Sequence, residues 1–341
     1  MQLIPMSQEL LINDRKESLL PKVLERFDGP VLFVIGHHDL INLDDIAKKS
    51  ISIIRIPPGL PDQDVIQNLL STIKITPATV VAIGGGRIMD AAKLIIHWSQ
   101  WQRPYFIAVP TTAGSGSEAT PFAVVYKKGE KFSIQDPTLL PDFVLLETCH
   151  LGLLSKKQRA ISGIDALAQA IESLWNKNAD PISKTYASQA LRIMLPQQVS
   201  FVNEPDALKD KNQLWASYLA GRAISITRTT GCHALSYYLT SRHDIPHGQA
   251  VALFLPLFFH YNQQTDLSSI HKLMNVADAS AAFDFLNQSM KDCGLATNFR
   301  ELGIEVNIDA LLQSVNAERF GNNPVPFDSV ELKKLIIQYL V

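Results

Sequence analysis

The sequence has few cysteines, no excess of charge of either sign and no long apolar run, and each absence excludes a class of protein. The three cysteines, Cys149, Cys232 and Cys293, are odd in number and far apart, which indicates free thiols rather than a disulfide framework. Lys and Arg number 31 against 33 Asp and Glu. There is therefore no basic excess of the kind that neutralises the phosphates of a nucleic acid.

The longest apolar run, Val251–Phe259, is interrupted by Pro256. It is far shorter than the roughly 20 residues that span a bilayer. The N-terminus lacks the basic region, apolar stretch and cleavage site of a secretory signal, so we expect a cytoplasmic protein. A length of 341 residues with 46% apolar residues is typical of a globular enzyme with two domains, and favours a homo-oligomer.

Short β-rich runs alternate with amphipathic stretches over the first 150 residues, which is the pattern of βαβ units in an open α/β sheet. The β-rich runs are continuously apolar, as parallel strands buried on both faces are. The predicted strands are Val31–Ile35, Ile51–Ile56, Val80–Ile83, Tyr105–Val109 and Phe143–Leu146, and the predicted helices are Lys16–Phe27, Asp62–Ile73 and Ile88–Trp98. A hairpin is predicted over Phe122–Gln135, with its turn at Lys128–Gly129.

After Leu151 the β-rich runs nearly disappear and long helical periodicities replace them. The predicted helices are Lys156–Trp175, Pro181–Leu195, Asp206–Ile226, Thr230–Leu239 and Gln249–Tyr261, followed by shorter ones up to Val341. The sequence therefore predicts an α/β N-terminal domain of residues 1–150 and an all-α C-terminal domain of residues 151–341.

Two loops that follow predicted strands have the composition of a phosphate-binding edge. Gly84, Gly85 and Gly86 end one strand and are followed at once by a helix, whose N-terminus can bind an anion. Met89 stands where the common dinucleotide fingerprint has its third glycine, and a plain strand-to-helix turn is the alternative interpretation. The second loop, Pro110–Thr120, is rich in hydroxyls, and both loops follow strand C-termini, so we expect one nucleotide groove.

The stretch Gly231–Gly248 contains two histidines, His233 and His247, fourteen residues apart. A helix from Thr230 that breaks near Ser241 and resumes after Pro246 allows both imidazoles to face one cavity. Upstream, Asp165 and Gln169 are four residues apart and share a helix face. Two histidines and a carboxylate are the usual ligands of a catalytic divalent metal.

Five motifs occur together and in order: Gly84–Gly86 with Asp90 and Lys93, Pro110–Thr120, Pro141-Asp142, Gly163–Glu172, and His233 with His247-Gly248. Over about residues 30–262 this set resembles the iron-containing, or group III, alcohol dehydrogenases of the dehydroquinate synthase-like superfamily. The resemblance implies a nucleotide-binding α/β domain, an all-α metal-binding domain and an active site in the cleft between them. It also implies NAD(P)-dependent interconversion of an alcohol and an aldehyde or ketone, with Fe²⁺ or Zn²⁺. The sequence of Ile224–Thr240 looks most like that of the phosphonoacetaldehyde reductase branch.

By the same resemblance, the metal ligands are Asp165, His233 and His247, with Gln169 where most members carry a fourth ligand, a histidine. An amide oxygen is a poorer ligand than imidazole, so Gln169 either ligates directly or orients Asp165 or a metal-bound water. Tyr237 replaces a histidine that many members use for proton transfer, and it either relays a proton or packs. His243 has no matching role.

The resemblance assigns the nucleotide groove to a set of residues at the loops, the hairpin and the last strand. They are Gly36, Gly84, Gly85, Gly86, Asp90, Thr111, Thr112, Ser115, Ser117, Lys131 and Leu146. Gly36 stands where the family has an aspartate that binds the adenosine ribose, which favours NADP over NAD, with His37 or His38 pairing with a 2′-phosphate.

Arg228 lies five residues before His233, where it can bind an anionic substrate group such as a phosphonate or carboxylate, or form a structural salt bridge. Arg222 does not share its helix face. We expect His97, His150, His260 and His271 to be surface or packing histidines.

Three other functions are compatible with parts of this pattern. A cyclase or lyase of the dehydroquinate synthase kind and a metal-free reductase of the maleylacetate reductase kind both conflict with Asp165. A non-catalytic nucleotide-binding protein with a decayed metal site is the third, and Gln169 is the residue that suggests it.

Overall fold

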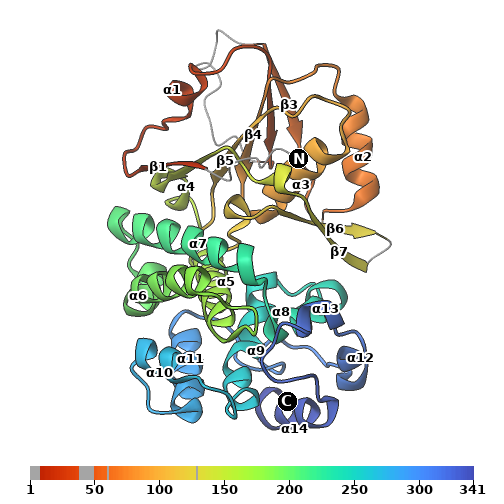
Figure 1. Cartoon of the computed structure of the whole chain (residues 1–341). Coiled ribbons are helices and arrows are strands. Elements are labelled where there is room, and N and C mark those ends of the chain that lie inside the picture. Colours follow the sequence, from red (N-terminus) through yellow and green to blue (C-terminus); the bar gives the residue numbers. More distant parts are fainter. Residues whose placement is uncertain (1–7, 38–49, 60, 128–129) are drawn as a thin grey trace. The chain divides into compact units, whose positions relative to one another are not determined.

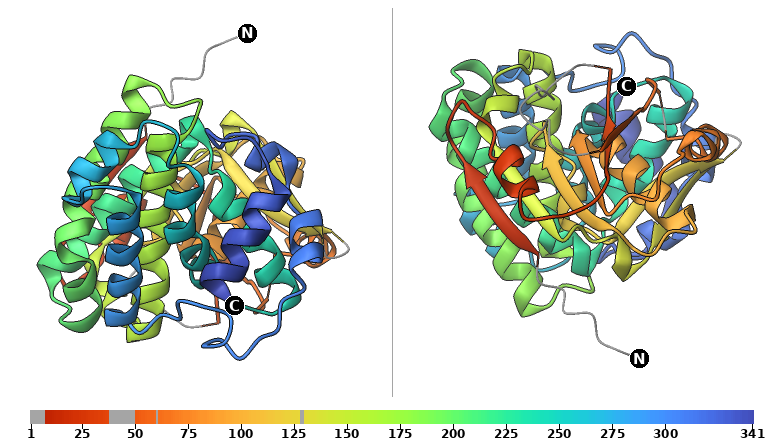
Figure 2. Two further views of the ribbon diagram at one scale, coloured as in Figure 1. Left: turned by 90° about the horizontal axis from the view of Figure 1, so that it is seen from below. Right: turned by 90° about the horizontal axis from the view of Figure 1, so that it is seen from above.

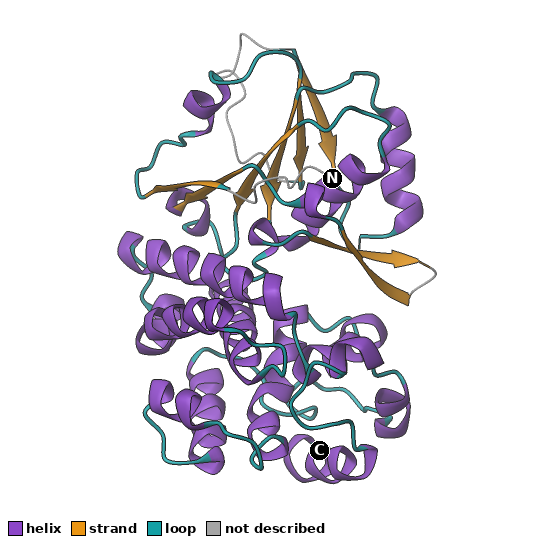
Figure 3. Ribbon diagram, viewed as in Figure 1, coloured by secondary structure: helices purple, strands orange, loops and turns teal. Residues whose placement is uncertain are grey.

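The computed structural model describes residues 8–37, 50–59, 61–127 and 130–341, and the chain divides into two compact units, Met1–Leu153 and Leu154–Val341 (Figure 1). The first unit contains the described strands, and the second is helical (Figure 3). The predicted combination of an α/β N-terminal part and an all-α C-terminal part is confirmed. No helix of the described residues is long and apolar enough to cross a membrane.

The sheet of the first unit has six parallel strands in the order β1-β8-β5-β4-β2-β3. Their bounds are β1 Glu9–Asn13, β2 Val31–Ile35, β3 Ile51–Arg55, β4 Thr79–Gly84, β5 Tyr105–Pro110 and β8 Phe143–Glu147. The five predicted strands are confirmed to within a residue or two, and β2 and β4 are buried along their whole length. The sequence analysis missed β1, an edge strand that pairs only with β8 and is partly exposed.

The first unit also contains the helices α1 Leu20–Leu24, α2 Gln63–Thr72, α3 Gly86–Trp98 and α4 Thr148–Leu151, and the hairpin of β6 Phe122–Lys127 and β7 Glu130–Gln135. The predicted turn at Lys128–Gly129 lies outside the described residues. The predicted helix Lys16–Phe27 was too long. Ser18 and the backbone N–H of Leu19 donate to the carboxylate of Glu147, so this segment is bound to β8 and α1 begins only at Leu20.

The second unit is built around α9, which is buried along nearly its whole length and packs against α5, α8, α11 and α14. Its helices are α5 Lys156–Trp175, α6 Pro181–Asn203, α7 Ala207–Thr227, α8 Gly231–Arg242, α9 His247–Tyr261, α10 Ser268–Met274, α11 Ala279–Asp292, α12 Ile308–Gln313, α13 Ala317–Phe320 and α14 Ser329–Leu340. The helices α5, α6 and α7 pack against one another, and they lie in the yellow-green to green part of the chain in Figure 2.

One predicted helix end in this unit was wrong. The sequence analysis ended a helix at Leu195, before Pro196, but α6 continues to Asn203. Proline removes one backbone hydrogen bond and bends the helix. Pro196 is exposed, and α6 is packed along α5 and α7. This packing outweighs the local cost of the proline.

Candidate functional site

The helices α5, α8 and α9 of the second unit position the predicted metal ligands. The predicted break is confirmed: α8 ends at Arg242 and α9 begins at His247. Gly248 then allows α9 to contact α5 directly, because a Cβ at this position would lie 2.1 Å from the backbone oxygen of Ile161. The first turn of α9 therefore packs on the turn of α5 just before Asp165.

The structure brings Asp165, His233 and His247 together, with one possible ligand atom from each within 4.8 Å of the others. Nε2 of His233 lies 3.4 Å from Oδ1 of Asp165, and the two imidazole rings are 5.3 Å apart between centroids. Asp165 and His233 are buried, whereas His247 is partly exposed. Two imidazoles and a carboxylate with one side open have the donor chemistry of a catalytic divalent metal site.

Gln169 is buried one helical turn after Asp165 on α5, as the spacing predicted. His243, in contrast, is the residue after α8, and its ring contacts Tyr238 rather than the cluster.

Glu172, which the sequence analysis gave no role, is the fully buried partner of His233. One carboxylate oxygen contacts Nδ1 of His233, and the other accepts the backbone N–H groups of Thr230 at 3.0 Å and Cys232 at 3.1 Å. This contact fixes the imidazole so that Nε2 points toward Asp165, as outer carboxylates do for metal-bound histidines. Its spacing was a usable signal, since Glu172 follows Asp165 by seven residues on the same helix face.

The electrostatics of the cluster favour a positive charge. Burial lowers the pKa of His233, but the charges of Glu172 and Asp165 outweigh burial and raise that pKa to about 10. For Glu172, burial acts to raise the pKa, because it disfavours the charged carboxylate. The contacts with His233 and Thr230 outweigh burial and hold the pKa of Glu172 below its usual value. Two carboxylates around one imidazole thus favour a cation at this position.

Tyr237 lies at the partly exposed side of the cluster, and Arg228 lies just before α8. The Tyr237 ring is stacked on His247 at 6.1 Å between centroids. The pKa of Arg228 is lowered by burial and by the charge of Arg319, while the charges of Glu318 and Tyr237 act in the opposite direction. Nη1 of Arg228 is 3.6 Å from the exposed Glu318.

The backbone of Arg228 has a φ of 62°, which is rare outside glycine. It is held there by Asn176, whose amide donates to the carbonyls of Thr227 at 3.0 Å and Arg228 at 3.1 Å. Arg222 lies elsewhere, over the ring of Tyr186.

In the first unit, the two glycine- and hydroxyl-rich loops lie against each other. Gly84 pairs with Pro110 at the ends of β4 and β5. A Cβ at Gly85 would lie 3.0 Å from Oγ1 of Thr112, and a Cβ at Gly86 would lie 2.8 Å from Ser115. The absence of side chains at Gly85 and Gly86 therefore allows the start of α3 to approach the second loop, at the carboxyl edge of the sheet where open α/β folds bind ligands.

Behind these loops, Lys93 is fully buried and donates to the carbonyls of Ser117, Thr120 and Phe122 at 2.5, 2.8 and 2.8 Å. The Ser117 hydroxyl donates to Asp90 at 2.8 Å. Burial lowers the pKa of Lys93 to about 8 and raises that of Asp90, whose charge is favoured by Lys93. Lys93 and Asp90 thus hold the second loop against α3.

The remaining predicted residues of the groove occupy different surroundings. Thr111 is buried, and Thr112 and Ser115 are partly exposed at the loop. Lys131, on β7, is close enough to Asp90 to favour its charge. Leu146 is fully buried on β8, in register with Ile12.

Gly36 follows β2 directly, and the exposed guanidinium of Arg55, the last residue of β3, donates to its carbonyl at 3.3 Å. His37 is exposed, and His38 lies outside the described residues. The sequence analysis missed Arg55. Arg55 lies at the end of a predicted strand, which was a usable signal for a residue at the ligand-binding edge. Only the strand order shows that this strand lies next to β2 and Gly36.

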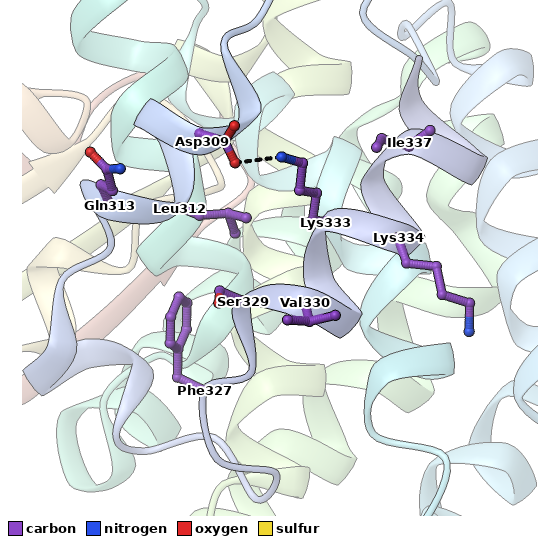
Figure 4. Close-up of a pocket in the computed structure, with 9 residues that line it drawn as sticks. All are labelled: Asp309, Leu312, Gln313, Phe327, Ser329, Val330, Lys333, Lys334 and Ile337. Carbon is purple, nitrogen blue, oxygen red and sulfur yellow. Dashed lines mark hydrogen bonds and ion pairs between the residues drawn. The ribbon is translucent and has the colours of Figure 1, made fainter.

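A surface groove of the second unit contains none of the predicted residues. It lies between α12 and α14, with Leu312, Phe327, Val330 and Ile337 as its apolar lining, and Lys333 pairs with Asp309 at 2.6 Å (Figure 4).

Comparison with known proteins matches both parts of the chain to one family. The profile described as iron-containing alcohol dehydrogenase matches residues 10–148, and that of the C-terminal part of the Fe-containing alcohol dehydrogenase family matches residues 159–339. Among curated proteins, the chain is 33% identical over 228 residues to the probable alcohol dehydrogenase EutG of Salmonella typhimurium, covering 61% of this chain and 57% of the relative. It is 32% identical over 207 residues to the phosphonoacetaldehyde reductase of Streptomyces viridochromogenes, covering 53% and 52%. The matched part thus spans little more than half the length of these relatives.

Solved structures share the fold over nearly the whole chain. A sulfoacetaldehyde reductase from Bifidobacterium kashiwanohense in complex with NAD⁺ superposes with a TM-score of 0.87 at 23% identity, covering 97% of this chain and 96% of that one. A 1,3-propanediol oxidoreductase gives a TM-score of 0.88 at 22% identity, covering 97% of each chain.

Proposed function

Since this chain belongs to the iron-containing alcohol dehydrogenase family, we propose that it is a metal-dependent, nicotinamide-linked oxidoreductase that interconverts an aldehyde and a primary alcohol. The observation that carries the proposal is the cluster of Asp165, His233 and His247, with Glu172 behind His233. Asp165 also distinguishes this function from the metal-free reductase and the cyclase, which are not favoured.

The donor set fits the metal that the family name implies, because one carboxylate and two imidazoles suit a divalent iron-type ion and leave a position for substrate. When bound, the ion polarises the carbonyl oxygen of the aldehyde and the reduced nicotinamide supplies the hydride. Glu172 holds His233 in the ligating orientation, and Gln169 adds a neutral amide one turn from Asp165.

Tyr237 is the proposed proton donor to the product alkoxide. Its ring lies on His247, at the partly exposed side of the cluster. A tyrosine hydroxyl can act as a general acid, and this position next to a proposed metal ligand places Tyr237 where the alkoxide would form.

NADP is the proposed dinucleotide. Gly36 offers no carboxylate to repel a 2′-phosphate, and the exposed Arg55 lies beside it at the end of β3. Many dinucleotide-binding folds bind the 2′-phosphate with an arginine that lies near the ribose-binding position. One curated relative, from Clostridium saccharobutylicum, is named as an NADPH-dependent butanol dehydrogenase.

The proposed substrate is an aldehyde with an anionic group. The charge of Arg319 disfavours the charge of Arg228, and an anionic substrate group bound by Arg228 would offset this repulsion. The names of two similar proteins, a phosphonoacetaldehyde reductase and a sulfoacetaldehyde reductase, describe aldehydes of this kind.

The decisive experiment measures NADPH and NADH oxidation by the purified chain with neutral, carboxylated, sulfonated and phosphonylated aldehydes, before and after chelator treatment and reloading with Fe²⁺ or Zn²⁺. We expect turnover that requires the metal and is fastest with NADPH and an anionic aldehyde. Absence of turnover with every aldehyde in metal-loaded protein contradicts the oxidoreductase. Equal turnover of neutral and anionic aldehydes contradicts only the role of Arg228.

A further inference from the structure

Three side chains at the end of the sheet form a second cluster with metal-ligand chemistry. Glu147 ends β8, and Cys149 and His150 lie in α4, with one possible ligand atom from each within 4.8 Å of the others. All three belong to the first unit, whereas Asp165, His233 and His247 belong to the second. We propose that Glu147, Cys149 and His150 bind a second divalent cation, and that this cation is Zn²⁺.

The spacing of the carboxylate and the imidazole supports a shared cation. Oε2 of Glu147 lies 3.3 Å from Nε2 of His150, and the equivalent pair in the first cluster, Asp165 and His233, is 3.4 Å apart. Two ligand atoms on a tetrahedral ion with bonds of about 2.0–2.1 Å are separated by about 3.3 Å. The second cluster therefore repeats the carboxylate–imidazole spacing of the proposed catalytic centre.

The carboxylate of Glu147 is held rigidly, as the ligands of metal sites are. It is fully buried, and it accepts the backbone N–H of Leu19 at 2.6 Å and the Ser18 hydroxyl at 2.7 Å. Each carboxylate oxygen has two lone pairs, so Oε2 can accept from Ser18 and still ligate a cation. Supporting hydrogen bonds of this kind orient ligands and raise metal affinity.

The identity of the ion follows from the third side chain. Cys149 has a free, partly exposed thiol, and His150 is buried beside it. Thiolate with imidazole and carboxylate favours Zn²⁺, whereas the first cluster has no sulfur ligand and suits an iron-type ion. Because Cys149 is partly exposed, an ion can reach the cluster from solvent.

The predicted assignment of His150 as an ordinary histidine is thus replaced by a ligand role in this proposal. The consequence is structural: a cation on Glu147, Cys149 and His150 links α4 to the end of β8. It also links both to the segment that ends at Leu19, because Glu147 already binds that segment. Binding to the folded chain alone raises the free energy of unfolding.

Cobalt substitution tests the thiolate ligand directly. The full chain is stripped with a chelator and reloaded with Co²⁺, and the near-ultraviolet thiolate-to-cobalt charge-transfer band is measured. We expect the band in the unaltered chain, in His247→Ala and in the matched control Cys293→Ser, and its complete loss in Cys149→Ser. Absence of the band in the unaltered chain, or its persistence in Cys149→Ser, overturns the proposal.

Zinc stoichiometry and stability provide a second readout that does not depend on activity. We expect about two ions per chain in the unaltered protein and about one in either Cys149→Ser or His247→Ala, with zinc raising the melting temperature of His247→Ala but not of the double variant. Cys149→Ser should retain aldehyde reduction, so a failure of the catalytic proposal remains distinguishable. One ion in both the unaltered chain and Cys149→Ser shows that Glu147 and His150 form only an ion pair.

Discussion

The nucleotide loops of the first unit and the metal cluster of the second are built in different ways. The loops are shaped by missing side chains and backbone groups: Gly85 and Gly86 allow the second loop to approach, and Lys93 holds three of its carbonyls. The metal cluster depends on ionisable side chains from three helices, and one of them, His233, is fixed by Glu172, which is distant in the sequence. We therefore expect changes of side-chain volume to damage the nucleotide loops, and changes of side-chain charge to damage the metal cluster.

The largest expected effect comes from the loss of a metal ligand, which should damage the metal cluster and leave the nucleotide loops intact. His247→Ala or Asp165→Ala removes one of three ligands, so the ion of this cluster and aldehyde reduction should be lost together, while NADPH binding and the ion proposed at Glu147, Cys149 and His150 are retained. Metal analysis, turnover and NADPH fluorescence titration check this. His243→Ala, outside the cluster, is the matched control and should retain all three properties. Turnover in metal-depleted His247→Ala would remove the metal from the mechanism.

Glu172→Gln should have the next largest effect, because it removes the charge behind His233 and keeps the shape. Loss of such a supporting carboxylate lowers metal affinity about 10- to 100-fold. Competition with a chromophoric chelator measures the dissociation constant. An unchanged metal affinity would show that Glu172 only caps the start of α8.

Gly86→Ala tests the nucleotide loops of the first unit, since the new Cβ would lie 2.8 Å from Ser115. Overpacking of this kind costs about 1–3 kcal/mol, so NADPH affinity should fall about tenfold. Metal content should stay constant. The control is Gly152→Ala, where the new Cβ makes only an ordinary contact at 3.7 Å. Equal NADPH affinity in Gly86→Ala and Gly152→Ala would contradict a tight loop contact.

Arg55→Ala should have the smallest effect and should sharpen the assignment of the dinucleotide. The guanidinium is exposed, so loss of its contact with a 2′-phosphate should raise the KM for NADPH about three- to tenfold. The KM for NADH should not change, and Lys74→Ala, another exposed cation of the first unit, should affect neither. An equal rise in the KM for both dinucleotides would show that Arg55 only holds the backbone at Gly36 and does not contact a 2′-phosphate.

Local pattern accounts for what could be predicted. The continuous apolar runs of β2 and β4, the break between α8 and α9, and the helix α5 are each determined by neighbours a few residues away. Their predictions were therefore confirmed. The failures were local patterns that a distant partner overrode. Hydrogen bonds to Glu147 hold Ser18 and the N–H of Leu19, so that α1 begins only at Leu20, and packing on α5 and α7 stabilises α6 beyond Pro196.

The sequence by itself determined the family, the order of strands and helices along the chain, and the residue types available for metal and nucleotide, because these depend on periodicity and motif. Only the tertiary structure decided which of these residues meet. Glu172 reaches His233 across 61 positions, and Arg55 reaches Gly36 only because β2 and β3 pair. Glu147 joins His150 to residues 18 and 19 near the start of the chain. Such contacts arise from the packing of elements far apart in sequence, which no local pattern records.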